Sequence, residues 1–224
     1  MFRSVEEAFV TIAVLAVMLL VAFPIHEFSH ALVAYRLGDG TAKLLGRLTL
    51  DPRAHFDPAG GTLLIITMLL PGSFAFGWAK PTPVSPFNLR GGRQGDALVA
   101  LAGPLSNFVL AAAAAIPLRT ILATQVDVPV AVLDVLALFI QINVALAVFN
   151  LIPLPPFDGG HVVEGLLPRN LAIHYAKLRR YGFLLLFLLL LVIPQLFPRA
   201  NIVDRLVGPP TEWLTRALLP NALL

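Results

Sequence analysis

Five long stretches of the chain carry no charged side chain, and this feature constrains the fold more than any other. They cover residues 8–25, 59–79, 97–118, 135–157 and 181–198. A stretch of about 18 or more such residues can cross a bilayer as a helix. Only 13% of the residues are charged, whereas a soluble domain carries roughly 25%. The sequence therefore predicts a polytopic membrane protein and excludes a soluble enzyme, a disordered protein and a nucleic-acid-binding arm.

The second of these stretches differs from the others. It contains four glycines and a proline, and its uninterrupted apolar run over 63–70 would be only about 12 Å long as a helix. A full span and a re-entrant element both remain open for it. Residues 48–50 before it and 80–84 after it favour an extended backbone, partly because a residue that precedes proline avoids the helical region. We expect a small β hairpin or sheet there, near the cytoplasmic membrane surface.

Residues 26–30 read His-Glu-Phe-Ser-His. On a helix, His26 and His30 share a face and can bind one metal ion, with Glu27 near enough to take a proton from a metal-bound water. This is the HExxH arrangement of zinc hydrolases. The alternative is a helix end that emerges into water. One observation argues against that alternative: His30 lies about 9 Å deeper along the helix into the membrane than Arg36. Ionisable groups at that depth are costly unless they are paired.

A catalytic zinc takes three protein ligands, and the chain has no cysteine. The third ligand must then be His, Asp or Glu. Asp158 directly follows the fourth apolar stretch, in a segment that prolines and glycines keep from continuing as a helix. A proline-rich loop with a water-facing carboxylate is the alternative, but we favour Asp158 as the ligand because it supplies the missing anionic oxygen.

Topology limits this pairing, because the end of the first stretch and Asp158 share a membrane face only if residues 59–79 do not fully cross. In that arrangement, eleven of the 16 Lys and Arg residues gather on the face that carries the site. Basic residues are enriched in cytoplasmic loops. We therefore expect the active site to open toward the cytoplasm.

Taken together and in this order, the motifs resemble the site-2 proteases, which are zinc intramembrane metalloproteases. The resemblance covers residues 20–165 and includes the HExxH motif, Asn150-x-x-Pro153-x-x-x-x-Asp158-Gly159 and the Gly-Pro-Leu-Ser-Asn segment at 103–107. It implies one Zn²⁺ per chain, bound by His26, His30 and Asp158, with Glu27 as the catalytic acid and base. It also implies a three-helix core in the cell membrane, and a short bacterial or archaeal form without PDZ or CBS domains.

Other polar residues have two possible roles each. Asn150 could donate to the scissile carbonyl or bond between helices, and Asn107 could serve the substrate or fill a small-residue packing stripe. His55 and Asp57 could form a second-shell pair near the metal or a capping turn. His161 follows Asp158 closely and its role stays open.

We therefore predict one all-α polytopic membrane domain over residues 1–224, with its three-helix catalytic core at about 8–165 and a C-terminal span and amphipathic tail at about 181–224. Metal-activated water would cleave transmembrane or membrane-adjacent segments of protein substrates, such as single-span or signal-peptide-like helices. The expected partners are such substrates and the lipid bilayer, not nucleic acid, and the oligomeric state is open. The alternatives are a membrane-embedded metal hydrolase of lipid or prenylated peptide, and a cation or metal transporter.

Overall fold

The structure is a computed structural model that describes residues 12–14, 16–69, 77–196 and 202–219. Within those ranges the chain forms helices and loops and contains no strand. In chain order the helical elements are η1 (Met18–Ala22), α2 (Phe23–Arg36), α3 (Thr41–Leu44), α4 (Pro52–His55), α5 (Pro58–Leu69), α6 (Gly92–Thr124), α7 (Val130–Asn150), α8 (Asp158–Leu166), α9 (Arg169–Ala176), η2 (Lys177–Tyr181), α10 (Gly182–Phe187), η3 (Leu188–Val192), α11 (Ile193–Leu196) and α12 (Ile202–Leu218).

Among the described residues, three helices are long and apolar enough to cross a membrane, namely Ile12–Arg36, Gly92–Thr124 and Val130–Asn150. They correspond to the first, third and fourth apolar stretches of the sequence. The second stretch contains α5, whose 12 described residues make about 18 Å of helix. The chain returns beside this helix, because Gly77 lies against Leu64 and Gly60 lies against Trp78. The last stretch is divided among α10, η3 and α11.

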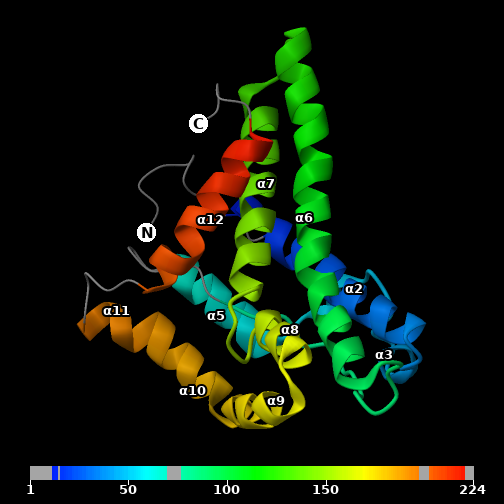
Figure 1. Cartoon of the computed structure of the whole chain (residues 1–224). Helices are drawn as coiled ribbons and strands as arrows, with labels where there is room; N and C mark the ends of the chain where they lie inside the picture. The colour runs from blue at the N-terminus through cyan, green and yellow to red at the C-terminus, as the bar shows by residue number, and fades with distance from the viewer. Residues whose placement is uncertain (1–11, 15, 70–76, 197–201, 220–224) are drawn as a thin grey trace.

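Helix α6 is the centre of the fold, because α2, α7 and α8 all pack against it. Figure 1 shows α6 and α7 as two long neighbouring helices, with α2 crossing the lower half of α6 and α8 beside its lower end. The loop of five residues between α6 and α7 is short enough to make these helices antiparallel neighbours. Helix α6 thus packs against both the HExxH helix and the helix that begins at Asp158.

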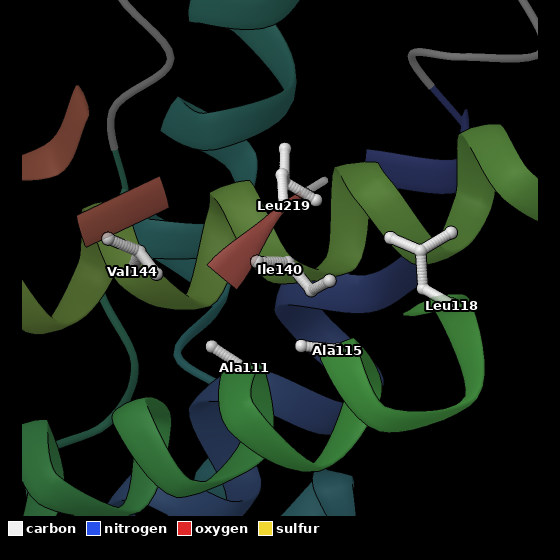
Figure 2. Close-up of a cluster of buried hydrophobic side chains, with 6 residues drawn as sticks. All are labelled: Ala111, Ala115, Leu118, Ile140, Val144 and Leu219. Atoms are coloured by element: carbon white, nitrogen blue, oxygen red, sulfur yellow. The ribbon is translucent and has the colours of Figure 1, made fainter. Parts of the chain in front are cut away.

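The contact between α6 and α7 is built on small side chains. Ala111 and Ala115 are buried on α6 against Ile140 and Val144 of α7, and Leu219 at the end of α12 closes the cluster (Figure 2). Small residues let two helices approach closely, which drives helix association inside a bilayer. The four-residue stripe of small residues on α6 therefore packs α7 at this end of the helix.

The amphipathic tail forms α12, which lies along α7 in Figure 1. Its Thr215 is buried, whereas Trp213 is 70% exposed. Arg119 of α6 donates hydrogen bonds to the carbonyls of Ala217 and Leu218. These bonds satisfy backbone acceptors that a helix leaves open at its C-terminus, and they attach the end of α12 to α6.

The prediction of a β hairpin or sheet is wrong for the described residues. Residues 48 and 49 form a bend, and residues 50 and 80–84 have no regular secondary structure. Their backbone groups are used elsewhere: Thr49 O accepts a hydrogen bond from His55, Lys80 N donates to His55 O, and Thr82 N donates to Glu27. Pro81 and Pro83 have no N–H to offer a neighbouring strand on one edge of the segment, and the N–H groups of Lys80 and Thr82 on the other edge are already used by His55 and Glu27.

Candidate metal centre

The structure brings together the three side chains that the sequence nominated as metal ligands. His26 and His30 lie one turn apart on α2, and their Nε2 atoms are 3.1 Å from each other. Asp158 Oδ2 lies 3.1 Å from His26 Nε2 and 3.3 Å from His30 Nε2. In a tetrahedral zinc site with bonds of about 2.0–2.2 Å, ligand atoms lie about 3.3–3.5 Å apart. The three atoms therefore have nearly the spacing that one zinc ion requires.

The outer nitrogens of both imidazoles are occupied, which fixes the direction of their lone pairs. His30 Nδ1 lies 2.7 Å from Val99 O, and His26 Nδ1 lies 3.3 Å from Asn107 Oδ1. Because a carbonyl oxygen only accepts, each Nδ1 carries the proton and donates. Each Nε2 then directs a lone pair at the space beside Asp158. Ligand histidines are usually held in this way from behind.

The inner oxygen of Asp158 fits a cation bound at this point. Oδ2 is buried and has no hydrogen-bond partner among the described residues, although two imidazole nitrogens lie beside it. Three electron-pair donors at this spacing repel one another unless a positive ion sits between them. The donor set of two imidazoles and one carboxylate suits zinc.

Gly103 of α6 leaves the room that this group needs. A Cβ at this position would lie 2.5 Å from His26 Cε1 and from His30 Nε2, and 2.6 Å from His26 Nε2. Any larger residue would thus enter the space where the two imidazoles face Asp158. The sequence placed Gly103 in a family-like segment, but its role beside the ligands was not predicted.

The loop before α8 turns Asp158 toward the histidines. Residues 151–157 are not helical, and α8 begins at Asp158. Gly159 sits so close to the carbonyls of Leu151 and Ile152 that a Cβ there would collide with both. A glycine is therefore required for the loop to fold back tightly enough to deliver the carboxylate.

Glu27 lies next to the ligands on α2 and is held by the extended segment. Thr82 N donates to Glu27 Oε2 over 2.8 Å, and Thr82 Oγ1 donates to Glu27 O over 3.0 Å. A backbone donor on one carboxylate oxygen fixes the orientation of the side chain and leaves the other oxygen available. This contact of Thr82 could not be predicted from the sequence.

Arg47 holds the same segment from the other side. Its side chain is buried, and its guanidinium donates to Lys80 O and, over 3.4 Å, to Pro81 O. Burial lowers the pKa of Arg47, and the negative charge of Glu27 partly offsets this effect. A positive charge therefore lies near the carboxylate that would act as acid and base.

Asp39 fixes the end of the HExxH helix to the segment before α6. It is fully buried and accepts hydrogen bonds from Thr41 and, over 2.7 Å, from Ser85 N, while Asn88 Nδ2 donates to it over 3.1 Å. Burial alone would raise the pKa of Asp39, but these donors stabilise the charged form more, and the net direction is downward.

The remaining candidate residues lie at different distances from this group. Asn107 contacts His26 as described, and its Nδ2 is buried without a partner among the described residues. Asn150 Nδ2 donates to Leu146 O in its own helix. Asp57 accepts from the N–H groups of Ala59 and Gly60 and so caps α5.

His55 is buried beside the same turn. Its Nε2 lies 2.7 Å from Thr49 O, and its Nδ1 has no hydrogen-bond partner in the described part of the chain. Neither His55 nor Asp57 forms a described hydrogen bond with the three ligand side chains. Their described hydrogen bonds are to the backbone of nearby residues in the turns before α5.

Comparison with known proteins shows which family the chain belongs to. The model of the family described as peptidase family M50 matches residues 117–193. The chain is 39% identical over 184 residues to "Putative zinc metalloprotease YwhC" of Bacillus subtilis, and the match covers 80% of both proteins. The chain belongs to peptidase family M50. This membership confirms the predicted resemblance to the site-2 proteases.

Two further M50 relatives carry the name "Putative zinc metalloprotease Rip2". The protein of Mycolicibacterium smegmatis is 30% identical over 174 residues, covering 77% of this chain and 64% of the relative. The protein of Mycobacterium tuberculosis is 33% identical over 172 residues, with the same two coverages. No solved structure matches the chain significantly.

Membership of M50, together with the group formed by His26, His30 and Asp158, confirms the predictions of a zinc metalloprotease and of Zn²⁺ as its cofactor. The three apolar helices and the family together also bear out the prediction of a membrane protein.

Proposed function

We propose that this M50 peptidase cleaves transmembrane or membrane-adjacent segments of protein substrates, with zinc held by His26, His30 and Asp158 and with Glu27 as the acid and base. One observation carries the proposal: three ligand atoms from two separate helices lie within 4.8 Å of one another. Glu27 follows His26 directly on the same helix.

The depth of the group supports a membrane substrate. His26 and His30 belong to the candidate span Ile12–Arg36, and His30 lies six residues before its end, about 9 Å along the helix. A soluble peptide would have to enter the bilayer to reach that level, whereas a membrane helix is already there. Its peptide bonds are hidden by helical hydrogen bonds, so cleavage also requires local unwinding.

The residues of the chain divide the chemistry among them. When bound, zinc supplies Lewis-acid polarisation of the peptide carbonyl and lowers the pKa of water toward about 7. Glu27 accepts a proton from the attacking water and delivers it to the leaving amine, a role that typically contributes about 10²–10⁴ in rate. Thr82 keeps one oxygen of Glu27 fixed, and Val99 and Asn107 hold the imidazoles. The unpartnered Nδ2 of Asn107 is available to a substrate carbonyl.

We propose further that the protein is multi-pass and that the site opens toward the cytoplasm. Support comes from the return of the chain beside α5, where Gly77 lies against Leu64 and Gly60 lies against Trp78. If this segment does not fully cross, the end of α2 and the start of α8 share one face. Basic residues then divide eleven to five, in the sense of the positive-inside rule. The eleven are Arg36, Lys43, Arg47, Arg53, Lys80, Arg90, Arg93, Arg169, Lys177, Arg179 and Arg180, and the five are Arg3, Arg119, Arg199, Arg205 and Arg216.

The test compares wild type with Glu27→Gln in liposomes that contain a tagged single-span protein, with bound zinc measured in both. Glu27→Gln should keep zinc and lose cleavage by about 10²-fold or more. Glu212→Gln, on the exposed face of α12, is the matched control and should cleave normally. Undiminished cleavage by Glu27→Gln would defeat the proposed role, and hydrolysis of lipid or metal flux without peptide cleavage would replace the proposed function.

A further inference from the structure

Outside the metal centre, four ionisable side chains from three elements meet at the start of α6. They are Asp96 of α6, His161 and Glu164 of α8, and Arg179 of η2. His161 Nδ1 lies 2.8 Å from Asp96 Oδ2, and Arg179 Nη2 lies 3.5 Å from the same oxygen and 3.0 Å from Glu164 Oε2. We call these four residues the Asp96 cluster.

The Asp96 cluster compensates a buried charge. Asp96 is only 7% exposed, and an uncompensated charge at such a site is strongly destabilising, whereas partners with good geometry repay much of that cost. His161 and Arg179 are those partners. None of the four residues contacts the metal ligands directly, so the mechanism above leaves the cluster without a role.

The cluster forms part of a broader attachment of α8 to α6. Gly165 lies so close to Ala97 that a Cβ on the glycine would collide with it. Arg93 donates from Nη2 to Leu167 O over 2.8 Å, at the end of α8. With the pair of His161 and Asp96, these contacts hold α8 along its whole length against the first two turns of α6.

The same helix α6 also positions the histidines, a few residues further along. Val99 O accepts from His30, Gly103 faces both imidazoles, and Asn107 contacts His26. Helix α6 therefore determines how far Asp158 lies from the two Nε2 atoms. Any shift of α8 along α6 changes that distance directly, and His161 lies only three residues after Asp158, on the same face of α8.

We propose that His161 and Asp96 are positioning residues for the metal centre, because they fix α8 on α6 so that Asp158 meets His26 and His30. Arg179 joins the segment after α8 to this pair, so the metal affinity depends on the docking of η2. The inference rests on the proposed zinc site and adds to it the contact that sets its geometry.

The test measures zinc affinity by competition with a chelator, and the visible spectrum of the Co²⁺-substituted protein, for variants in detergent. His161→Leu removes the donor to Asp96 and should weaken zinc binding about 10- to 100-fold and shift the Co²⁺ bands. His161→Asn keeps a nitrogen donor near the Nδ1 position and should recover most of the affinity. Asp96→Asn combined with His161→Leu should weaken binding no further than either change alone, because both remove one contact.

Arg179→Met should also weaken zinc binding, with helix content by circular dichroism checked alongside, because Arg179 is 39% exposed but pairs with the buried Asp96. Arg180→Met is its matched control, since Arg180 lies over the ring of Tyr181 and forms no described ion pair with the Asp96 cluster, and it should bind zinc as wild type does. Unchanged affinity and an unchanged Co²⁺ spectrum in His161→Leu and Arg179→Met would overturn the inference. Failure of wild type itself to bind zinc would instead overturn the proposed function.

Discussion

Replacing Gly103 by alanine adds one methyl group at the point where α6 faces the two ligand histidines. The new Cβ would lie 2.5 Å from His30 Nε2 and 2.6 Å from His26 Nε2, whereas ordinary contacts begin at 3.4 Å. The backbone of α6 is held by α7 and α8, so the imidazoles must move by about 0.9 Å.

That displacement is several times what a metal site tolerates, since ligand distances in working sites stay within about 0.2 Å of their ideal values. Changes that only disturb the groups behind a ligand typically cost 10- to 100-fold in metal affinity. A direct displacement of both histidines should cost at least the upper figure. We therefore expect Gly103→Ala to weaken zinc binding by about 100-fold or more, equivalent to about 2.7 kcal/mol.

The assay is a competition titration of zinc against a chelator of known affinity, with helix content checked by circular dichroism. Gly208→Ala on α12 is the matched control, because a Cβ at Gly208 meets nothing within 4 Å. It should bind zinc normally. Zinc binding by Gly103→Ala at the affinity of wild type would refute the placement of the site against α6.

Three further predictions follow from single contacts. Thr82→Pro removes the N–H that holds Glu27 and should lower turnover about 10-fold or more with zinc retained. Thr82→Val keeps that N–H and should lower turnover less. Equal turnover of the two variants would exclude a role for the backbone contact. Because the folded-state pKa of Asp39 is lowered, its contribution to stability is present above the unfolded value of about 4 and is lost as the pH falls through the folded value. Melting temperatures between pH 6 and pH 3 should therefore fall less steeply for Asp39→Asn than for wild type, and parallel curves would contradict the assignment. Removing zinc with a chelator should lower the free energy of unfolding of wild type by about 2.7 kcal/mol relative to a free zinc concentration 100 times Kd, which is measured as a lower melting temperature. The melting temperature of His26→Ala should not change on the same treatment, and an equal drop in both proteins would point to another metal site.

The ligand group itself could be predicted from the sequence. The spacing of four residues places His26 and His30 on one face of a helix. Their depth in the membrane relative to Arg36 predicted that they bind a charged partner. With no cysteine in the chain, Asp158 was the candidate at the end of an apolar stretch. The structure brings these three side chains together, as the proposed topology requires, in which residues 59–79 do not fully cross.

The residues that support the group were harder to find. Val99 acts through its backbone carbonyl and Thr82 through its backbone N–H. Almost every residue carries these groups, so their role cannot be predicted from the residue types in a single sequence. Gly103 and Asn107 share a small-residue stripe with Ala111 and Ala115. The period of the stripe predicted packing, and only the structure shows that its first half faces α2 and its second half α7.

The prediction of strands was wrong for a physical reason that the sequence did contain. Pro81 and Pro83 favour an extended backbone, but they also remove every second N–H of the segment. The remaining donors of Lys80 and Thr82 go to His55 and Glu27. An extended conformation was therefore a sound expectation, and its pairing into a sheet was not.

The most direct test of the account is the zinc content of purified wild type and Asp158→Ala, measured as moles of metal per mole of chain after the same dialysis. The account predicts one zinc ion in wild type and a large loss in Asp158→Ala, with helix content preserved. Full zinc occupancy in Asp158→Ala would contradict the claim that the start of α8 completes a metal site on α2.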